Sequence, residues 1–184
     1  MSAENIIIQL QDYTSVYPEE MEFKTQFLQL LNTHKTCFKR SLKIGHITGS
    51  AWIMDQSMEY ALLTHHMKLN KWLQLGGHAD GDTNIARVAH REALEESGLK
   101  SVTLSSNKIF DIDIHTIPER KNEAEHLHYD IRYLFNANKT ESLQHNHESK
   151  ALKWVRLSEI PSLVNNNLSI MRMIEKSNLL VNMK

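Results

Sequence analysis

The sequence predicts an α/β protein in which a mixed β-sheet lies between helices. Two segments alternate strictly between polar and apolar residues, which is typical of strands with one buried face. Other segments repeat apolar residues three and four positions apart, which is typical of amphipathic helices. The two kinds of segment interleave without a regular strand–helix–strand rhythm. This favours a mixed sheet covered by helices over a doubly wound parallel sheet.

The first predicted element is an N-terminal amphipathic helix that begins at Pro18. Proline is tolerated in the first turn of a helix, and the acids Glu19 and Glu20 that follow are favoured there by the helix dipole. Apolar residues then recur at helical spacing: Phe23, Phe27, Leu30, Leu31 and Phe38.

Strands come next along the chain. Residues 49–55 and 59–66 are predicted to pair as a hairpin, and residues 71–77 form a short strand that ends in two glycines. Two segments that alternate strictly, residues 108–117 and 126–135, are predicted to be strands, and residues 151–157 are predicted to be another.

The remaining helices follow from capping signals and periodicity. Residues from about 84 to 97 are predicted to be helical, with Gly98 in the position after the last turn where glycine is common. Helical segments at residues 158–167 and 168–180 close the chain.

Composition and charge exclude some classes of partner. With 21 basic and 22 acidic side chains, the chain lacks the long basic run that nucleic-acid binding by phosphate neutralisation needs. Its single cysteine, Cys37, allows no internal disulfide and suits a reducing compartment. The N-terminal residues lack the features of a secretory signal, and no apolar run approaches the ~18–20 residues that span a bilayer. We therefore expect a cytoplasmic protein without nucleic-acid or membrane partners, and a homodimer stays open.

The helix predicted near residue 90 carries three acids on one face. Glu92, Glu95 and Glu96 stand at i, i+3 and i+4, so their carboxylates converge, and like charges at this spacing cost about 0.2–0.5 kcal/mol per pair. Arg91 can pair with one of them but not with all three. Mg²⁺ prefers such oxygen ligands and shares its shell with phosphate, and the bare backbone at Gly77 could add a carbonyl. The alternative is an acidic helix face that is simply solvated.

Residues 77–99 resemble the signature of the Nudix hydrolase family. That signature is a glycine, five residues, a glutamate, seven residues, then Arg-Glu, an aliphatic residue, any residue, Glu-Glu, any residue, glycine and an aliphatic residue. The chain has Gly77, Thr83 and then Arg91-Glu92-Ala93-Leu94-Glu95-Glu96-Ser97-Gly98-Leu99 at this spacing. Six of the seven fixed residues match, and Thr83 replaces the first glutamate.

The resemblance implies the family's α/β/α sandwich and a single Nudix domain over residues 1–184, with residues 1–40 as a helical extension packed on it. It also implies an enzyme that cleaves a phosphoanhydride bond in a nucleoside diphosphate linked to another moiety, using Mg²⁺ or Mn²⁺. Carried onto this chain, the implied metal ligands are the Gly77 carbonyl and three carboxylates: Glu92, Glu95 and Glu96. Arg91 would orient and balance these charges.

Thr83 is the departure from the family pattern. The family's glutamate at this position pairs with the motif arginine and assists the metal shell, and a neutral threonine does neither as an anion. Asp80 and Asp82 lie close by in the sequence and are candidates to substitute for it.

Catalysis by such a site needs a base that takes a proton from water. The residues expected to carry catalysis are Glu95, Glu96, Arg91 and Glu148. For the base itself, the sequence leaves Glu96, Glu148 and Glu125 open. Glu148 precedes a predicted strand at a place where the family often has a further acid linked to the metal, and Glu125 lies in a loop, residues 118–126, that could fold over the site.

Two of the predicted strands carry polar side chains that alternate along one face. Asp111, Asp113 and His115 share a face of the strand predicted at residues 108–117. If this strand pairs with residues 126–135, the polar faces of the two strands lie side by side. The expected substrate contacts are His78, His126, His128 and Asp130. A sharper alternative makes His126 and His128 ligands of a transition metal, and a plainer one makes this face solvent-exposed.

Three functions therefore compete. The first is the metal-dependent pyrophosphohydrolase, which acts on a small nucleotide-type substrate. The second is a binding module that holds nucleotides without hydrolysing them, which Thr83 keeps open. The third is an enzyme like isopentenyl-diphosphate isomerase, which shares the fold and depends on a well-placed cysteine, whereas Cys37 is far in sequence from the motif.

Overall fold

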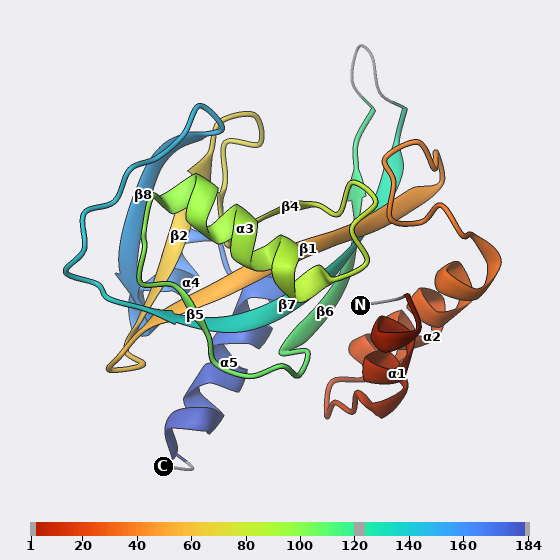
Figure 1. Cartoon of the computed structure of the whole chain (residues 1–184). Coiled ribbons are helices and arrows are strands. Elements are labelled where there is room, and N and C mark those ends of the chain that lie inside the picture. The colour runs from red at the N-terminus through yellow and green to blue at the C-terminus, as the bar shows by residue number, and fades with distance from the viewer. Residues whose placement is uncertain (1–2, 120–123, 183–184) are drawn as a thin grey trace. The chain divides into compact units, whose positions relative to one another are not determined.

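The computed structural model describes residues 3–119 and 124–182 (Figure 1). Its helices are α1 (Ala3–Asp12), α2 (Pro18–Thr33), α3 (Ile85–Ser97), α4 (Ile160–Leu163) and α5 (Leu168–Asn182), with a 3₁₀ turn at Leu157–Glu159. Its strands are β1 (Gly45–Asp55), β2 (Tyr60–His66), β3 (Trp72–Leu73), β4 (Leu75–His78), β5 (Thr103–Leu104), β6 (Asp111–Ile117), β7 (His126–Ala137) and β8 (Ser149–Arg156).

The described strands pair in the order β3-β2-β1-β7-β5, with β4 beside β1, β6 beside β7 and β8 beside β2. Most of these strand pairs are antiparallel, as in β6 with β7, where Asp113 is opposite Asp130. β1 and β7 run parallel, because Leu127 N–H donates to Ile44 O while Thr48 bonds to Asp130, so residue numbers rise together. The sheet is therefore mixed, and the predicted α/β class with its N-terminal helix is confirmed.

The chain divides into two compact units, each built from three segments. Unit 1 consists of Met1–Ser50, Gly76–Ala89 and Ser106–Tyr133. Unit 2 consists of Ala51–Leu75, His90–Ser105 and Leu134–Lys184. β1, α3 and β7 each contain residues of both units. The single domain over residues 1–184 stays a prediction.

Unit 1 contains the N-terminal helices. α1 lies against α2, and α2 contacts β6 (Figure 1). α2 begins at Pro18 as predicted, but it ends at Thr33, so the buried Phe38 lies beyond the helix. α1 was not predicted from the sequence, and it buries Ile6 and Leu10.

Unit 2 contains the predicted hairpin. Met54 of β1 is opposite Ala61 of β2. β8 pairs along the whole of β2, from Arg156 opposite Tyr60 to Ser149 opposite His66. The fully buried Trp52 donates its ring N–H to Ser177 Oγ at 2.9 Å, which ties β1 to α5. The core of this unit therefore lies between the strands and α5.

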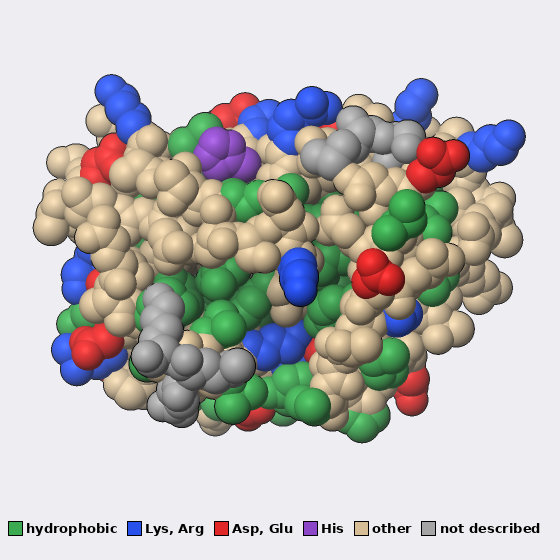
Figure 2. Space-filling view, turned by 60° about the horizontal axis from the view of Figure 1, so that its bottom comes forward, with side chains coloured by type: hydrophobic (Ala, Val, Ile, Leu, Met, Phe, Trp, Pro, Cys, Tyr) green, Lys and Arg blue, Asp and Glu red, His purple; other side chains and the backbone are tan. Residues whose placement is uncertain are grey.

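Apolar side chains reach the surface on the face that Figure 2 shows. In unit 2, α5 exposes Leu179, Leu180 and Val181 near its C-terminal end. Among residues 3–119 and 124–182, no helix combines the length and apolar character that crossing a bilayer requires.

Candidate active site

Helix α3 carries the acids, and its ends are set by local sequence signals. Asn84 Oδ1 accepts a hydrogen bond from Arg87 N–H at 3.2 Å, so Asn84 caps the first turn. Gly98 adopts φ +69°, which a residue with a side chain rarely does, and its N–H donates to Leu94 O. The predicted helix boundaries are therefore confirmed to within one residue.

Three acids of α3 differ strongly in exposure. Glu96 is buried, the Glu92 side chain is 16% exposed and the Glu95 side chain is 60% exposed. Arg91 pairs with Glu92 at 2.7 Å and lies 3.9 Å from Glu95. Arg91 is therefore close to two of the three carboxylates, those of Glu92 and Glu95.

Burial raises the pKa of Glu92. Arg91 opposes this shift by hydrogen bond and charge, while the nearby carboxylates of Glu95 and Glu148 reinforce it. Glu148, which lies in unit 2 just before β8, therefore belongs to the same electrostatic group as Glu92 and Glu95. The carboxylates of Glu92, Glu95 and Glu148, together with that of Glu96 on the same helix, offer oxygen donors that suit a hard divalent cation.

The two aspartates near Thr83 have other partners. Asp82 forms paired bonds with Arg87, both at 2.8 Å, and Asp80 pairs with Arg40. Both aspartates therefore neutralise arginines other than Arg91 in these contacts.

Gly76 and Gly77 lie in β4, in unit 1. A Cβ at Gly76 would come within 2.2 Å of Ser50 Oγ and 2.7 Å of Ser50 Cα, so only glycine lets β4 lie this close to β1. His78 follows directly and ends β4.

Five imidazoles gather on unit 1, and we call them the histidine cluster: His46 on β1, His78 on β4, His115 on β6, and His126 and His128 on β7. Four neighbouring strands thus each contribute at least one ring. The His46 ring centroid lies 4.9 Å from that of His128 and 5.0 Å from those of His78 and His126. The His78 centroid lies 4.9 Å from that of His128.

Burial and crowding keep the His128 ring neutral. Burial lowers the pKa of His128, and the neighbouring rings of His78, His115, His46 and His126 lower it further, to about 2. At physiological pH the His128 ring therefore has one nitrogen that carries a hydrogen and one with a free lone pair.

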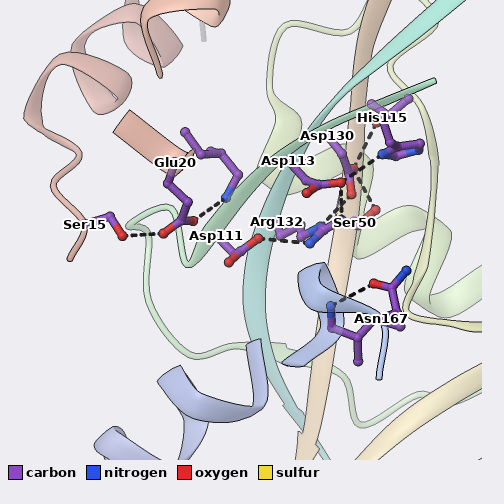
Figure 3. A network of polar contacts seen from close by, with 12 residues as sticks. Ser15, Glu20, Ser50, Asp111, Asp113, His115, Asp130, Arg132 and Asn167 are labelled. Atoms are coloured by element: carbon purple, nitrogen blue, oxygen red, sulfur yellow. Dashed lines mark hydrogen bonds and ion pairs between the residues drawn. The ribbon is translucent and has the colours of Figure 1, made fainter. Parts of the chain in front are cut away.

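A buried ion-pair network continues along the same face (Figure 3). Arg132 Nε lies 2.8 Å from Asp130, and its terminal nitrogens lie 3.0 Å from Asp111 and 3.2 Å from Asp113. Asp130 also accepts hydrogen bonds from Thr48 at 2.9 Å and Ser50 at 2.8 Å. The carboxylate of Asp130, predicted to contact substrate, is therefore engaged by the fold.

The predicted site residues fall into two groups. Unit 1 holds Gly77, His78, His126, His128 and Asp130. Unit 2 holds Arg91, Glu92, Glu95, Glu96 and Glu148. Glu125 is exposed in unit 1 just before β7, and residues 120–123 of its loop lie outside the described residues.

Two members of the histidine cluster, His46 and His115, were not among the predicted site residues. His46 alternates with Thr48 and Ser50, and this period of two is the signal that could have assigned it to the polar face of β1.

Comparisons with known proteins identify the family and the fold of the chain. The NUDIX domain family model matches residues 46–174, whereas no curated protein matches the chain. A solved hydrolase of the NUDIX family from Clostridium perfringens is 30% identical, with a TM-score of 0.54, and the match covers 73% of this chain and 97% of that one.

More distant structures share the fold. An Ap4A hydrolase from C. elegans is 17% identical, with a TM-score of 0.60 and coverage of 75% and 98%. The MutT protein of Methanosarcina mazei Go1 is 21% identical, with a TM-score of 0.55 and coverage of 78% and 99%. At these identities the likeness concerns the fold alone.

Proposed function

Because the chain belongs to the NUDIX domain family, whose hydrolases act on diphosphate bonds, we propose that it is a metal-dependent pyrophosphohydrolase of nucleotide-type substrates. The observation that carries this proposal is the carboxylate group of unit 2, which comprises Glu92, Glu95, Glu96 and Glu148. The first three lie on α3 within five residues, and the charges of Glu95 and Glu148 both act on Glu92.

The residues present fit Mg²⁺ or Mn²⁺. Hard cations take oxygen ligands, and the raised pKa of Glu92 reflects burial and nearby like charges that a cation would offset. We propose Glu92, Glu95, Glu96 and the Gly77 carbonyl as ligands. When bound, such an ion neutralises phosphate charge and lowers the pKa of water.

The side chains of the chain then have separate tasks. Arg91 orients Glu92 through its 2.7 Å bond and limits repulsion between Glu92 and Glu95. Glu96 and Glu148 are the proposed proton acceptors for the attacking water, and Glu125, which is exposed just before β7, stays a further candidate. We propose that His78, His126 and His128 bind the substrate.

The test is hydrolysis of nucleoside diphosphate sugars, dinucleotides and nucleoside triphosphates with Mg²⁺ or Mn²⁺. We expect release of a nucleoside monophosphate or of pyrophosphate that stops when EDTA removes the metal. Glu96→Gln should lower kcat by about 10²-fold or more if Glu96 is a ligand or base. The exposed Glu159→Gln is the matched control, and equal rates for the two variants would remove Glu96 from this role.

Two other functions are separated by the same assay. Thr83 favours a nucleotide-binding module, which would bind these nucleotides without turnover. An isomerase that uses Cys37 is disfavoured, because Cys37 is 1% exposed, lies beyond the end of α2, and burial raises the pKa of its thiol to about 11. A cytoplasmic location and a homodimer are further proposals, which fractionation and light scattering test.

A further inference from the structure

The proposed hydrolysis leaves the donor geometry of the histidine cluster unexplained. One ring nitrogen from each of His46, His78 and His128 lies within 4.8 Å of the other two. In a tetrahedral zinc site with bonds of about 2.0–2.1 Å, the ligand nitrogens are about 3.3–3.4 Å apart. The distances between these three nitrogens therefore need to shorten by at most about 1.5 Å for all three to bind one ion.

His128 supplies an independent reason for an ion. Its Nε2 is buried and has no hydrogen-bond partner in the part of the chain that the structure describes. A buried polar atom without a partner costs about 1–3 kcal/mol, so such atoms are uncommon in native proteins. Coordination of Nε2 by a cation would remove this cost.

Neighbouring rings of the histidine cluster are oriented by other groups. His126 Nδ1 lies 2.8 Å from Ala124 O, which can only accept, so this nitrogen carries the hydrogen. His115 Nδ1 lies 3.1 Å from Asp113 Oδ2. These two bonds fix the orientation of His126 and His115, so these rings border the proposed donors and are not themselves among the ligands.

We propose that His46, His78 and His128 form a site for a transition-metal ion such as Zn²⁺, with the fourth position taken by water or another ligand. The chemistry of the donors separates this site from the carboxylate group of unit 2. Three neutral nitrogens suit Zn²⁺, Co²⁺, Ni²⁺ or Cu²⁺, whereas Mg²⁺ requires oxygen. The site involves only unit 1 and does not depend on hydrolysis.

The experiment measures metal binding by the full chain after chelator treatment. Calorimetry with Zn²⁺ should show one tight site, Co²⁺ should give the intense visible bands of tetrahedral coordination, and zinc X-ray absorption should show imidazole nitrogens at about 2.0–2.1 Å. The X-ray absorption result on the unmodified chain tests the site even if a variant fails to fold.

Variants then assign the ligands. His78→Gln and His128→Gln should each weaken Zn²⁺ affinity by about 100-fold or more, with folding checked by circular dichroism. The exposed His145→Gln is the matched control, and Glu96→Gln should also keep the affinity while it lowers hydrolysis.

Three results would overturn the proposal: no stoichiometric Zn²⁺ binding, a zinc shell dominated by carboxylate oxygen, or unchanged affinity in folded His78→Gln and His128→Gln. Loss of hydrolysis together with intact Zn²⁺ binding would contradict only the proposed enzymatic function.

Discussion

Arg132 is a single cation that three aspartates share inside unit 1. Its side chain is 3% exposed, and Asp111, Asp113 and Asp130 all lie within 3.2 Å of its nitrogens. Burial disfavours the charged guanidinium, but the three carboxylates outweigh this and raise the pKa of Arg132. Each aspartate in turn depends on Arg132, because a buried carboxylate without a cation is costly.

Replacing Arg132 should therefore be among the most damaging single changes in the protein. We expect Arg132→Met to lower the free energy of unfolding by about 3–5 kcal/mol, measured by urea denaturation, because it leaves buried charges uncompensated. Arg156 is the control, since its exposed side chain pairs with Glu59, and Arg156→Met should cost less than about 1 kcal/mol. Similar losses for the two variants would contradict a special role for the buried network.

Alternation along β6 and β7 predicted which of these side chains share a face, and the register confirms it, with Asp113 opposite Asp130. It did not predict that the face is buried at Asp111 and Arg132. A strand face whose polar residues alternate with a period of two usually faces solvent. Here the structure shows that ion pairs between the strands allow this face to be buried. Sequence pattern therefore predicted the neighbours of Arg132 but not their environment.

At the scale of elements, Glu20 joins α2 to the sheet. Glu20 is fully buried. Its carboxylate accepts hydrogen bonds from Tyr13 OH at 2.6 Å, from Ile112 N–H at 3.1 Å and from Ser15, which Figure 3 shows beside it. Ile112 lies on β6, which pairs with β7 alone in the described sheet. Glu20 thus accepts a hydrogen bond from a backbone N–H at the edge of the sheet. Unpaired backbone groups at such an edge can pair with strands of other chains.

We expect Glu20→Ala to lower the free energy of unfolding by about 3 kcal/mol, because hydrogen bonds to a charged group contribute about 1.5–3 kcal/mol. Amide exchange should rise at Ile112 in particular, since its acceptor is removed. Exposed Glu22 on the same helix is the control, and Glu22→Ala should change stability by less than about 0.5 kcal/mol. Unaltered exchange at Ile112 in Glu20→Ala would show that the glutamate does not hold β6.

Element boundaries were predictable where a local signal sets them. Pro18 begins α2, and Asn84 and Gly98 bound α3. α1 has no such signal, and its run Ile6–Ile8 is β-branched, which lowers helix propensity. Burial of Ile6 and Leu10 stabilises this helix, so tertiary packing decides it rather than the local sequence.

For the whole molecule, the Nudix motif is one continuous run in the sequence but is divided between the units after Ala89. The run predicted the family and the fold, and it contains three of the four acids of the carboxylate group, whereas Glu148 lies outside it. It could not predict that His46 joins His78 and His128, because their contact depends on β4, β1 and β7 lying side by side. Residues joined by sheet pairing over long sequence separations leave no spacing signal.

The carboxylate group also predicts how the stability of the whole chain responds to metal. A cation that binds the folded chain alone stabilises it by RT ln(1 + [L]/Kd), or about 2.7 kcal/mol at 100 times Kd. Glu92→Gln keeps an oxygen acceptor for Arg91 but removes a buried charge that Glu95 and Glu148 repel. Without Mg²⁺ we therefore expect the variant to unfold at the same temperature as the unmodified chain or higher.

With Mg²⁺ at constant ionic strength, the Tm of the unmodified chain should rise while that of Glu92→Gln rises much less, so the order of stability reverses. This reversal is expected of a metal site in which repulsion between neighbouring carboxylates lowers the stability of the metal-free chain. Glu159→Gln, a change at an exposed carboxylate, should behave as the unmodified chain does under both conditions. A Glu92→Gln variant that is less stable without Mg²⁺, or that keeps the full rise in Tm, would show that this glutamate supports the fold rather than the metal.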